Sequence, residues 1–85
     1  EESNRANGDF DMLRSFVRSL ATAGTSLTVI KTTVGAAQTV AAAIDRAEWP
    51  EVVGTISGDD TIFLATDTAR AQAQVVERLR GLFRV

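Results

Sequence analysis

Hydrophobic residues near the start of the chain have the spacing of an amphipathic helix. Phe10, Leu13, Val17 and Leu20 lie three or four positions apart, a period that predicts a helix from about Phe10. The second half of this stretch, residues 16–24, fits equally well a strand that runs into a glycine turn. Periodicity alone leaves both interpretations of residues 16–24 open.

Two later stretches have the same helical spacing. The alanine-rich run 35–50 begins at a glycine and stops at a proline, residues that favour helix boundaries. Thr66 or Thr68 can cap a last helix, because a threonine hydroxyl accepts hydrogen bonds from free N–H groups of the first turn. The apolar stripes of the two helices consist of Ala37, Val40, Ile44 and Ala47, and of Ala71, Val75, Leu79 and Leu82.

Stretches rich in β-branched residues predict strands at 26–33, 51–57 and 60–68. The last two strands are joined through Gly58-Asp59, and such a glycine-first pair is suited to a type II′ hairpin turn. The chain order is helix or strand, strand, helix, strand, strand, helix. This order predicts a two-layer α+β sandwich with an antiparallel sheet.

The strand predicted at 60–68 is apolar on both faces. Ile62 and Leu64 point to one side, and Phe63 and Ala65 point to the other. Helices of the same domain can cover one face, and a partner subunit is a good candidate for the other. The hydrophobic fraction of 45% supports a partner, because it is high for a small chain with a large surface-to-volume ratio.

Composition excludes most catalytic and metal chemistry. The 85 residues, enough for one domain, contain no cysteine and no histidine, which removes thiolate and imidazole metal ligands, cysteine nucleophiles and histidine-based triads. The formal net charge of −2 gives no nucleic-acid footprint. Apolar runs are too short to span a bilayer, and no signal segment opens the sequence. We therefore expect a cytoplasmic protein that is not an enzyme and does not enter a membrane.

Two neighbouring carboxylates, Asp59 and Asp60, stand between apolar runs in the segment GTISGDDTI, residues 54–62. One interpretation is an ordinary acidic turn, since glycine and aspartate favour turns on backbone grounds alone. The other is a cation site, because adjacent carboxylates repel each other unless a cation lies between them. A guanidinium is an apt partner, since its planar fork donates two parallel hydrogen bonds to a carboxylate.

A second candidate pair is Gln38 with Asp45. Seven residues are almost two helical turns, so both side chains lie on one stripe, with room left beside them by Ala41 and Ala42. Gln38 lies in the first turn, where free N–H groups attract a carboxylate, and Asp45 offers an acceptor to an ammonium. A solvated polar edge is the alternative. Together with the acidic turn, the pair describes a site for a zwitterion with a basic side chain.

The segments VGAAQTVAAAID and VVGTISGDDTIF together resemble the C-terminal domain of the bacterial arginine repressor, over about residues 12–83. The resemblance implies a four-stranded antiparallel sheet with helices on one face, as in the DCoH-like pterin dehydratases, and a strand after Phe16. It also implies trimers that stack into hexamers with L-arginine bound between them. Residues 1–9 would end an interdomain linker, residues 10–85 would form the oligomerisation and arginine-binding domain, and an N-terminal winged helix-turn-helix that binds operator DNA would be absent.

The resemblance also assigns roles to single residues. The amino-acid end of L-arginine would be held by Ala37, Gln38, Asp45, Thr55 and Ser57. Asp59 would reach the guanidinium from the opposing trimer, with Asp60 beside it, and no metal would take part. Ser57 stands where the family has an alanine, a change that main-chain contacts survive. The implied function is an arginine-dependent regulator of genes for arginine biosynthesis and catabolism.

Two alternatives stay open at this stage. One is a purely structural oligomerisation module with an incidental acidic turn, and the other is a sensor of a different amino acid. Lysine would satisfy a single carboxylate less specifically than arginine, since its ammonium is a point charge without the guanidinium fork. A pterin dehydratase activity is disfavoured, because those enzymes use histidines and this chain has none.

Overall fold

The computed structural model describes residues 9–85, so the linker predicted at 1–9 lies outside the described residues except for Asp9. Residues 9–13 are helical. The later elements are η1 (Arg14–Phe16), β1 (Val17–Ala23), β2 (Leu27–Thr32), α2 (Ala37–Ala47), β3 (Val52–Ser57), β4 (Thr61–Thr66) and α3 (Ala69–Phe83). The helix predicted from Phe10 and the strand predicted after Phe16 are therefore both confirmed, each for its own half of the stretch.

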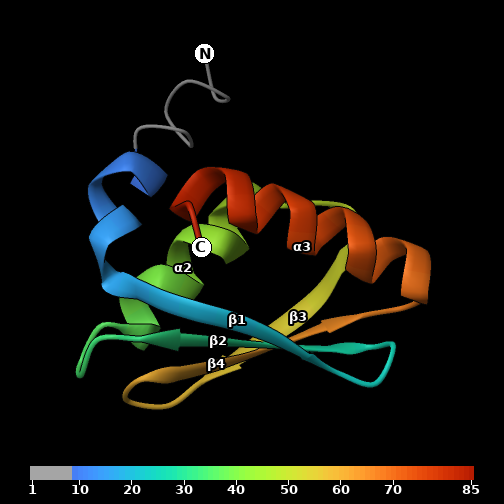
Figure 1. Cartoon of the computed structure of the whole chain (residues 1–85), viewed down its shortest axis with the longest axis horizontal. Coiled ribbons are helices and arrows are strands. Elements are labelled where there is room, and N and C mark those ends of the chain that lie inside the picture. Colours follow the sequence, from blue (N-terminus) through green and yellow to red (C-terminus); the bar gives the residue numbers. More distant parts are fainter. Residues whose placement is uncertain (1–8) are drawn as a thin grey trace.

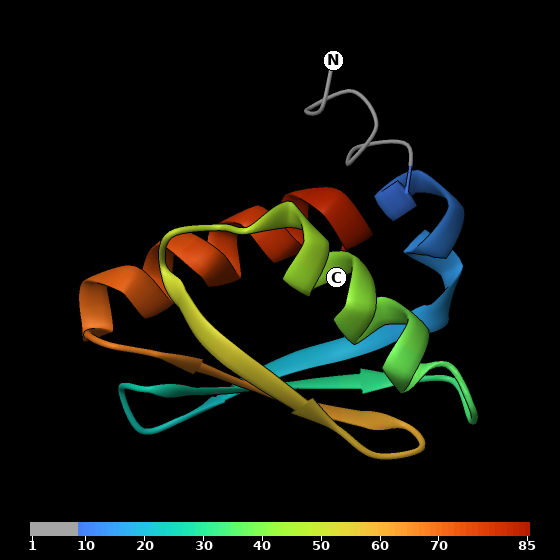
Figure 2. The same ribbon diagram turned by 180° about the vertical axis from the view of Figure 1, so that it is seen from behind.

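The four strands form one antiparallel sheet in the order β1-β2-β4-β3. Both α2 and α3 lie on the same face of this sheet, and the opposite face carries no helix (Figure 1). The view from behind shows the same two layers (Figure 2). The predicted α+β sandwich with a four-stranded antiparallel sheet and helices on one face is thus confirmed for residues 9–85.

Strand β4 has the two faces that its sequence predicts. Ile62 and Leu64 are fully buried under the helices, whereas Phe63, on the other face, is 50% exposed. Ile30 lies opposite Ile62 on β2 and is also fully buried. The core therefore lies between the sheet and the helices. Each such side chain removed from water contributes about 1.5–3 kcal/mol to the stability of the fold. The remaining buried apolar residues of this core include Phe10, Val40, Ile44, Val75 and Leu79.

The helix boundaries differ slightly from those that the sequence predicts. α2 begins at Ala37, two residues after Gly35, and it ends at Ala47, because Glu48 takes a left-handed conformation with a φ of 53°. Pro50 therefore lies three residues beyond the helix. α3 is capped by Thr68, whose hydroxyl oxygen accepts a hydrogen bond from a first-turn N–H group. Of the two predicted caps, Thr68 is the correct one.

The type II′ turn predicted at Gly58-Asp59 is wrong. The N–H of Gly58 donates to the carbonyl of Thr61 over 2.9 Å, so Asp59 and Asp60 are the two residues at the tip. Gly58 does not have the positive φ that a type II′ turn requires at its first central position. The physical reason is tertiary: the carbonyls of both aspartates accept hydrogen bonds from residues 32–37, between the end of β2 and the start of α2, which fixes the turn in another shape.

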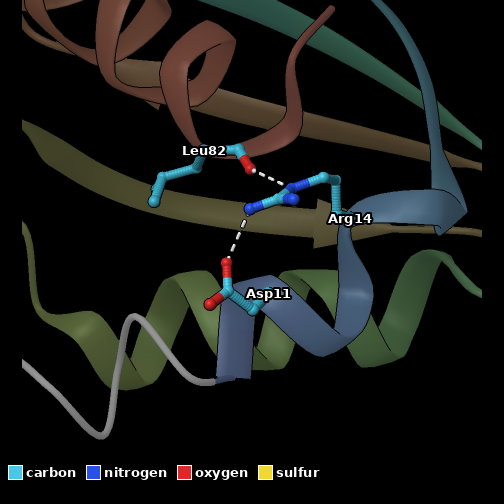
Figure 3. Close-up of polar contacts among 3 residues, drawn as sticks. All are labelled: Asp11, Arg14 and Leu82. Carbon is cyan, nitrogen blue, oxygen red and sulfur yellow. Dashed lines mark hydrogen bonds and ion pairs between the residues drawn. The ribbon is translucent and has the colours of Figure 1, made fainter.

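The first helical turn is fixed to the end of α3. Arg14 donates through Nε to the carbonyl of Leu82 over 3.3 Å and through a terminal nitrogen to Asp11 over 2.7 Å (Figure 3). Phe10 stacks on Trp49, with 5.4 Å between the ring centroids. Trp49 is partly buried and packs against the core. A cation near the last carbonyls of a helix is favoured by the helix dipole.

Candidate functional site

Helix α2 and strand β3 bring two of the predicted site residues into contact. Thr55 donates its hydroxyl hydrogen to Oδ1 of Asp45 over 2.9 Å. The alternation of β3 explains this contact, because Thr55 lies opposite the buried Leu64 and therefore faces the helix layer. Ser57 lies two residues further on the same face. Since a carboxylate has two oxygens, Oδ2 of Asp45 stays available for an ammonium group.

The start of α2 lies against the acidic tip of the β3–β4 hairpin (Figure 2). The N–H of Ala37 donates to the carbonyl of Asp59 over 3.2 Å, and Ala37 itself is fully buried. Gln38 follows and is exposed. Within residues 9–85, no backbone carbonyl accepts a hydrogen bond from the N–H groups of Gln38 and Thr39. These two donors at a helix N-terminus are available to an anion such as a carboxylate.

The two carboxylates of the acidic tip have different surroundings. Asp60 accepts a hydrogen bond from the hydroxyl of Thr61 over 3.0 Å, and that hydroxyl oxygen accepts one from the ammonium of Lys31 over 3.1 Å. Asp59 is exposed, and its carboxylate has no hydrogen-bond or ion-pair partner within residues 9–85. Asp60 is thus held by its own chain, and Asp59 is open to a group from outside.

The predicted residues form two half-sites in one chain, not one closed pocket. The first is Asp45 with Thr55, and the second is the acidic tip with the start of α2. Asp45 lies seven residues after Gln38, about 10 Å along a helix that rises 1.5 Å per residue. The Asp45 side chain leans toward the helix N-terminus, so its carboxylate lies closer to the free N–H groups at the start of α2 than this rise suggests. The side chains of Gln38 and Ser57 make no hydrogen bond to the other predicted residues within the part of the chain described.

Sequence reasoning missed two residues at this place, Lys31 and Gly35. Lys31 reaches Thr61 because the two lie opposite each other on β2 and β4, strands that pair across an intervening helix and strand. No local pattern specifies that pairing. Gly35 was predicted as the start of a helix, whereas its N–H donates to the carbonyl of Asp59 over 3.1 Å. The glycine itself was the signal, but its partner was not predictable from the sequence.

A further charged cluster stabilises the fold away from these half-sites. Arg78 on α3 donates to both carboxylate oxygens of Glu51, over 3.0 and 3.5 Å, and its guanidinium lies 4.9 Å from the ring centre of Trp49. The pKa of Glu51 is lowered mainly by a hydrogen bond from the backbone of Glu51 itself. Burial raises this pKa, and the Arg78 guanidinium lowers it further. The cluster joins α3 to the connection between α2 and β3.

Within residues 9–85, no three acidic side chains come close enough together to hold a metal ion. The helices within residues 9–85 are also too short or too polar to cross a bilayer.

Comparison with known proteins identifies relatives for this arrangement. The family model "Arginine repressor, C-terminal domain" matches residues 13–81. An arginine repressor of Caldicellulosiruptor bescii is 58% identical over 57 residues, covering 67% of this chain and 38% of that protein. One from Koribacter versatilis is 44% identical over 71 residues, 84% of this chain and 47% of that protein. Another, from Thermotoga petrophila, is 45% identical over 69 residues, which cover 81% of this chain and 45% of that protein. The chain thus spans less than half the length of these relatives.

Proposed function

Because the chain belongs to the arginine repressor family, as a C-terminal domain, we propose that it senses L-arginine by binding it between copies of itself. The observation that carries this proposal is the state of Asp59. Its carboxylate is exposed and unpaired within residues 9–85, although its backbone is fixed against α2. A carboxylate on a fixed backbone, with no partner in its own chain, is open to a guanidinium, which donates two parallel hydrogen bonds to it.

The amino-acid end of the ligand binds along α2 in this proposal. Asp45, oriented by the hydrogen bond from Thr55, accepts from the α-ammonium group. Gln38 and the free N–H groups at the start of α2 hold the α-carboxylate, favoured by the helix dipole. Ser57 completes this end through its main chain, and Ala37, whose N–H donates to the carbonyl of Asp59, lies beside it. The ligand then extends its side chain away from the helix, toward a neighbouring copy.

The guanidinium end is held by another chain. Three copies form a trimer, two trimers face each other, and Asp59 of the opposing trimer pairs with the guanidinium, with Asp60 beside it. Without ligand, carboxylates from facing trimers repel each other across the interface. Arginine neutralises them and links the two halves. A ligand that binds only the assembled state stabilises that state by mass action, and the coupling between binding and assembly is reciprocal.

The open face of the sheet supports assembly from several copies. Ile56 is 78% exposed and Phe63 50% exposed, and the two lie opposite each other on β3 and β4. They line a hollow of about 390 Å³ together with Val53 and Leu27. An apolar surface of this kind on a small soluble domain is typical of an interface between proteins. We assign it to contacts between copies of this domain.

In the whole protein, this domain would control DNA binding rather than perform it. A winged helix-turn-helix outside this chain would contact operator DNA of genes for arginine biosynthesis and catabolism. The arginine-bound hexamer would set the arrangement of these DNA-binding units. We place this regulator in the cytoplasm, where free arginine is sensed, and give it no catalytic role.

Calorimetric titration of the purified chain with L-arginine, L-lysine and L-citrulline tests the ligand. Arginine should bind most tightly, because lysine lacks the guanidinium fork and citrulline lacks the charge. Asp59→Asn should weaken arginine binding by tenfold or more, since a hydrogen bond to a charged group contributes about 1.5–3 kcal/mol. Equal binding of all three compounds would favour a sensor of another amino acid. No heat with any of them would favour a purely structural module.

A further inference from the structure

The segment that leads into α2 contains a tight turn with an unusual backbone conformation at Gly35. The N–H of Ala36 donates to the carbonyl of Thr33 over 3.1 Å, and Gly35 is the third residue of this turn. Its φ is +83°, in the region that residues with a Cβ rarely adopt. A positive φ at the third position is the mark of a type II turn, for which glycine is favoured.

The turn directs two N–H groups at one acceptor in the acidic tip. Gly35 and Ala37 both donate to the carbonyl of Asp59, over 3.1 and 3.2 Å. A third hydrogen bond to the tip runs from the N–H of Thr32 to the carbonyl of Asp60, over 2.8 Å. The backbones of both acidic residues are therefore attached to residues 32–37. These contacts explain how an exposed hairpin tip with two like charges is held in one position.

We propose that Gly35 is a positioning residue for arginine recognition, because its left-handed backbone brings two N–H groups together on the Asp59 carbonyl. This inference rests on the proposed function. Alanine at this position would favour a negative φ, and the N–H groups of residues 35 and 37 would then no longer converge on one acceptor. The tip would then keep its charge but lose its fixed position. Binding of a ligand that bridges two copies is sensitive to such a displacement, because the residues of both copies must contact its two ends at the same time.

Gly24 provides a matched control within the same chain. It also has a left-handed backbone, with a φ of +70°, and lies in the turn between β1 and β2. An added Cβ meets no heavy atom within 4 Å at either glycine. Gly24→Ala and Gly35→Ala therefore introduce the same kind of backbone strain without a steric clash. Gly24 lies before β2 and Gly35 after it, so the two turns are at opposite ends of this strand (Figure 1).

Arginine titrations of the native chain, Gly35→Ala, Gly24→Ala and Gly35→Asn test the proposal. Gly35→Ala should bind arginine at least tenfold more weakly than Gly24→Ala, although thermal unfolding shows similar stability. Gly35→Asn should recover most of the affinity, because asparagine enters the left-handed region more readily than alanine. Equal affinity of the two alanine variants, or no recovery with asparagine, would overturn the role of Gly35.

Amide hydrogen exchange of the ligand-free chains separates this inference from the proposed function. The Ala37 amide should be protected in the native chain and in Gly24→Ala, and it should exchange faster in Gly35→Ala. Unchanged protection would show that Gly35 does not hold the tip. A native chain that protects this amide but does not bind arginine would overturn the proposed function, and the ligand role of Gly35 with it, while leaving the attachment of the tip established.

Discussion

Thr55 on β3 donates its hydroxyl hydrogen to the carboxylate of Asp45 on α2, with 2.9 Å between the two oxygens. This contact crosses from the sheet to the helix layer and orients the carboxylate without neutralising it. Thr55→Val should leave the fold intact and weaken arginine binding about tenfold, the effect of losing one hydrogen bond of about 1–1.5 kcal/mol. Calorimetry measures the affinity, and Thr55→Ser, which keeps the hydroxyl, is the control. Equal affinities for the valine and serine variants would contradict an orienting role.

The open sheet face should control assembly. Phe63→Glu places a charge on a half-exposed position of that face, so the chain should fold but sediment at a lower mass than the native protein. Met12→Glu is the control, because Met12 is 79% exposed and lies in the helical residues 9–13, away from the sheet face. Analytical ultracentrifugation gives the masses. If both variants sediment like the native chain, the open face is not the interface.

Thr28 should be a site where the fold can be stabilised. It is fully buried on β2, and its hydroxyl has no hydrogen-bond partner within the described residues. Thr28→Val removes this unsatisfied group and should raise the free energy of unfolding by about 1 kcal/mol. Thr32→Val on the same strand is the control, because that hydroxyl donates to the carbonyl of Thr33 over 2.8 Å and its loss should destabilise. Urea unfolding should show opposite signs for the two variants; equal signs would contradict this account.

The pair Glu51–Arg78 should make stability dependent on pH. The pKa of Glu51 lies below its ordinary value of 4.5, first because of a hydrogen bond from its own backbone and then because of Arg78. A lowered pKa in the folded state means that the contribution is complete above pH 4.5 and is lost as the pH falls through the lower, folded value. Glu51→Gln should therefore cost up to about 1 kcal/mol at pH 7. That difference should shrink below pH 4.5; a difference that stays constant would contradict the assignment.

The layers of the fold were predictable from local patterns, whereas the contacts of the acidic tip were not. The alternation of Ile62 and Phe63 on β4 identified the buried and open faces, because strand side chains have a period of two. The helical spacing that begins at Phe10 did not predict the structure beyond Phe16, because the apolar residues there also fit a strand. Motif and charge indicated Gln38, Asp45, Asp59 and Asp60, whereas Ala37, Thr55 and Ser57 followed only from the family resemblance. Their grouping into two half-sites depends on β3 folding against α2, which no stretch of sequence states by itself.

The type II′ turn predicted at Gly58-Asp59 was wrong because tertiary contacts determine the shape of this turn. Glycine followed by aspartate is a strong local signal for a type II′ turn, but three backbone hydrogen bonds from residues 32–37 to the carbonyls of Asp59 and Asp60 determine its shape instead. Tertiary contacts of this kind override local propensity. Positions where they do so are expected at functional sites, and here these contacts fix the backbone that carries the two carboxylates.

Mixing two variant chains tests most directly whether arginine bridges separate copies. Asp45→Asn damages one half-site and Asp59→Asn the other, so each variant alone should bind arginine weakly. When equal amounts are unfolded together and refolded, an Asp59→Asn copy contributes its intact Asp45 and an Asp45→Asn copy its intact Asp59. The account predicts that calorimetry of the mixture shows tight arginine binding at a fraction of the sites. Binding no stronger than that of the two variants measured separately would show that the site lies within one chain and would contradict the account.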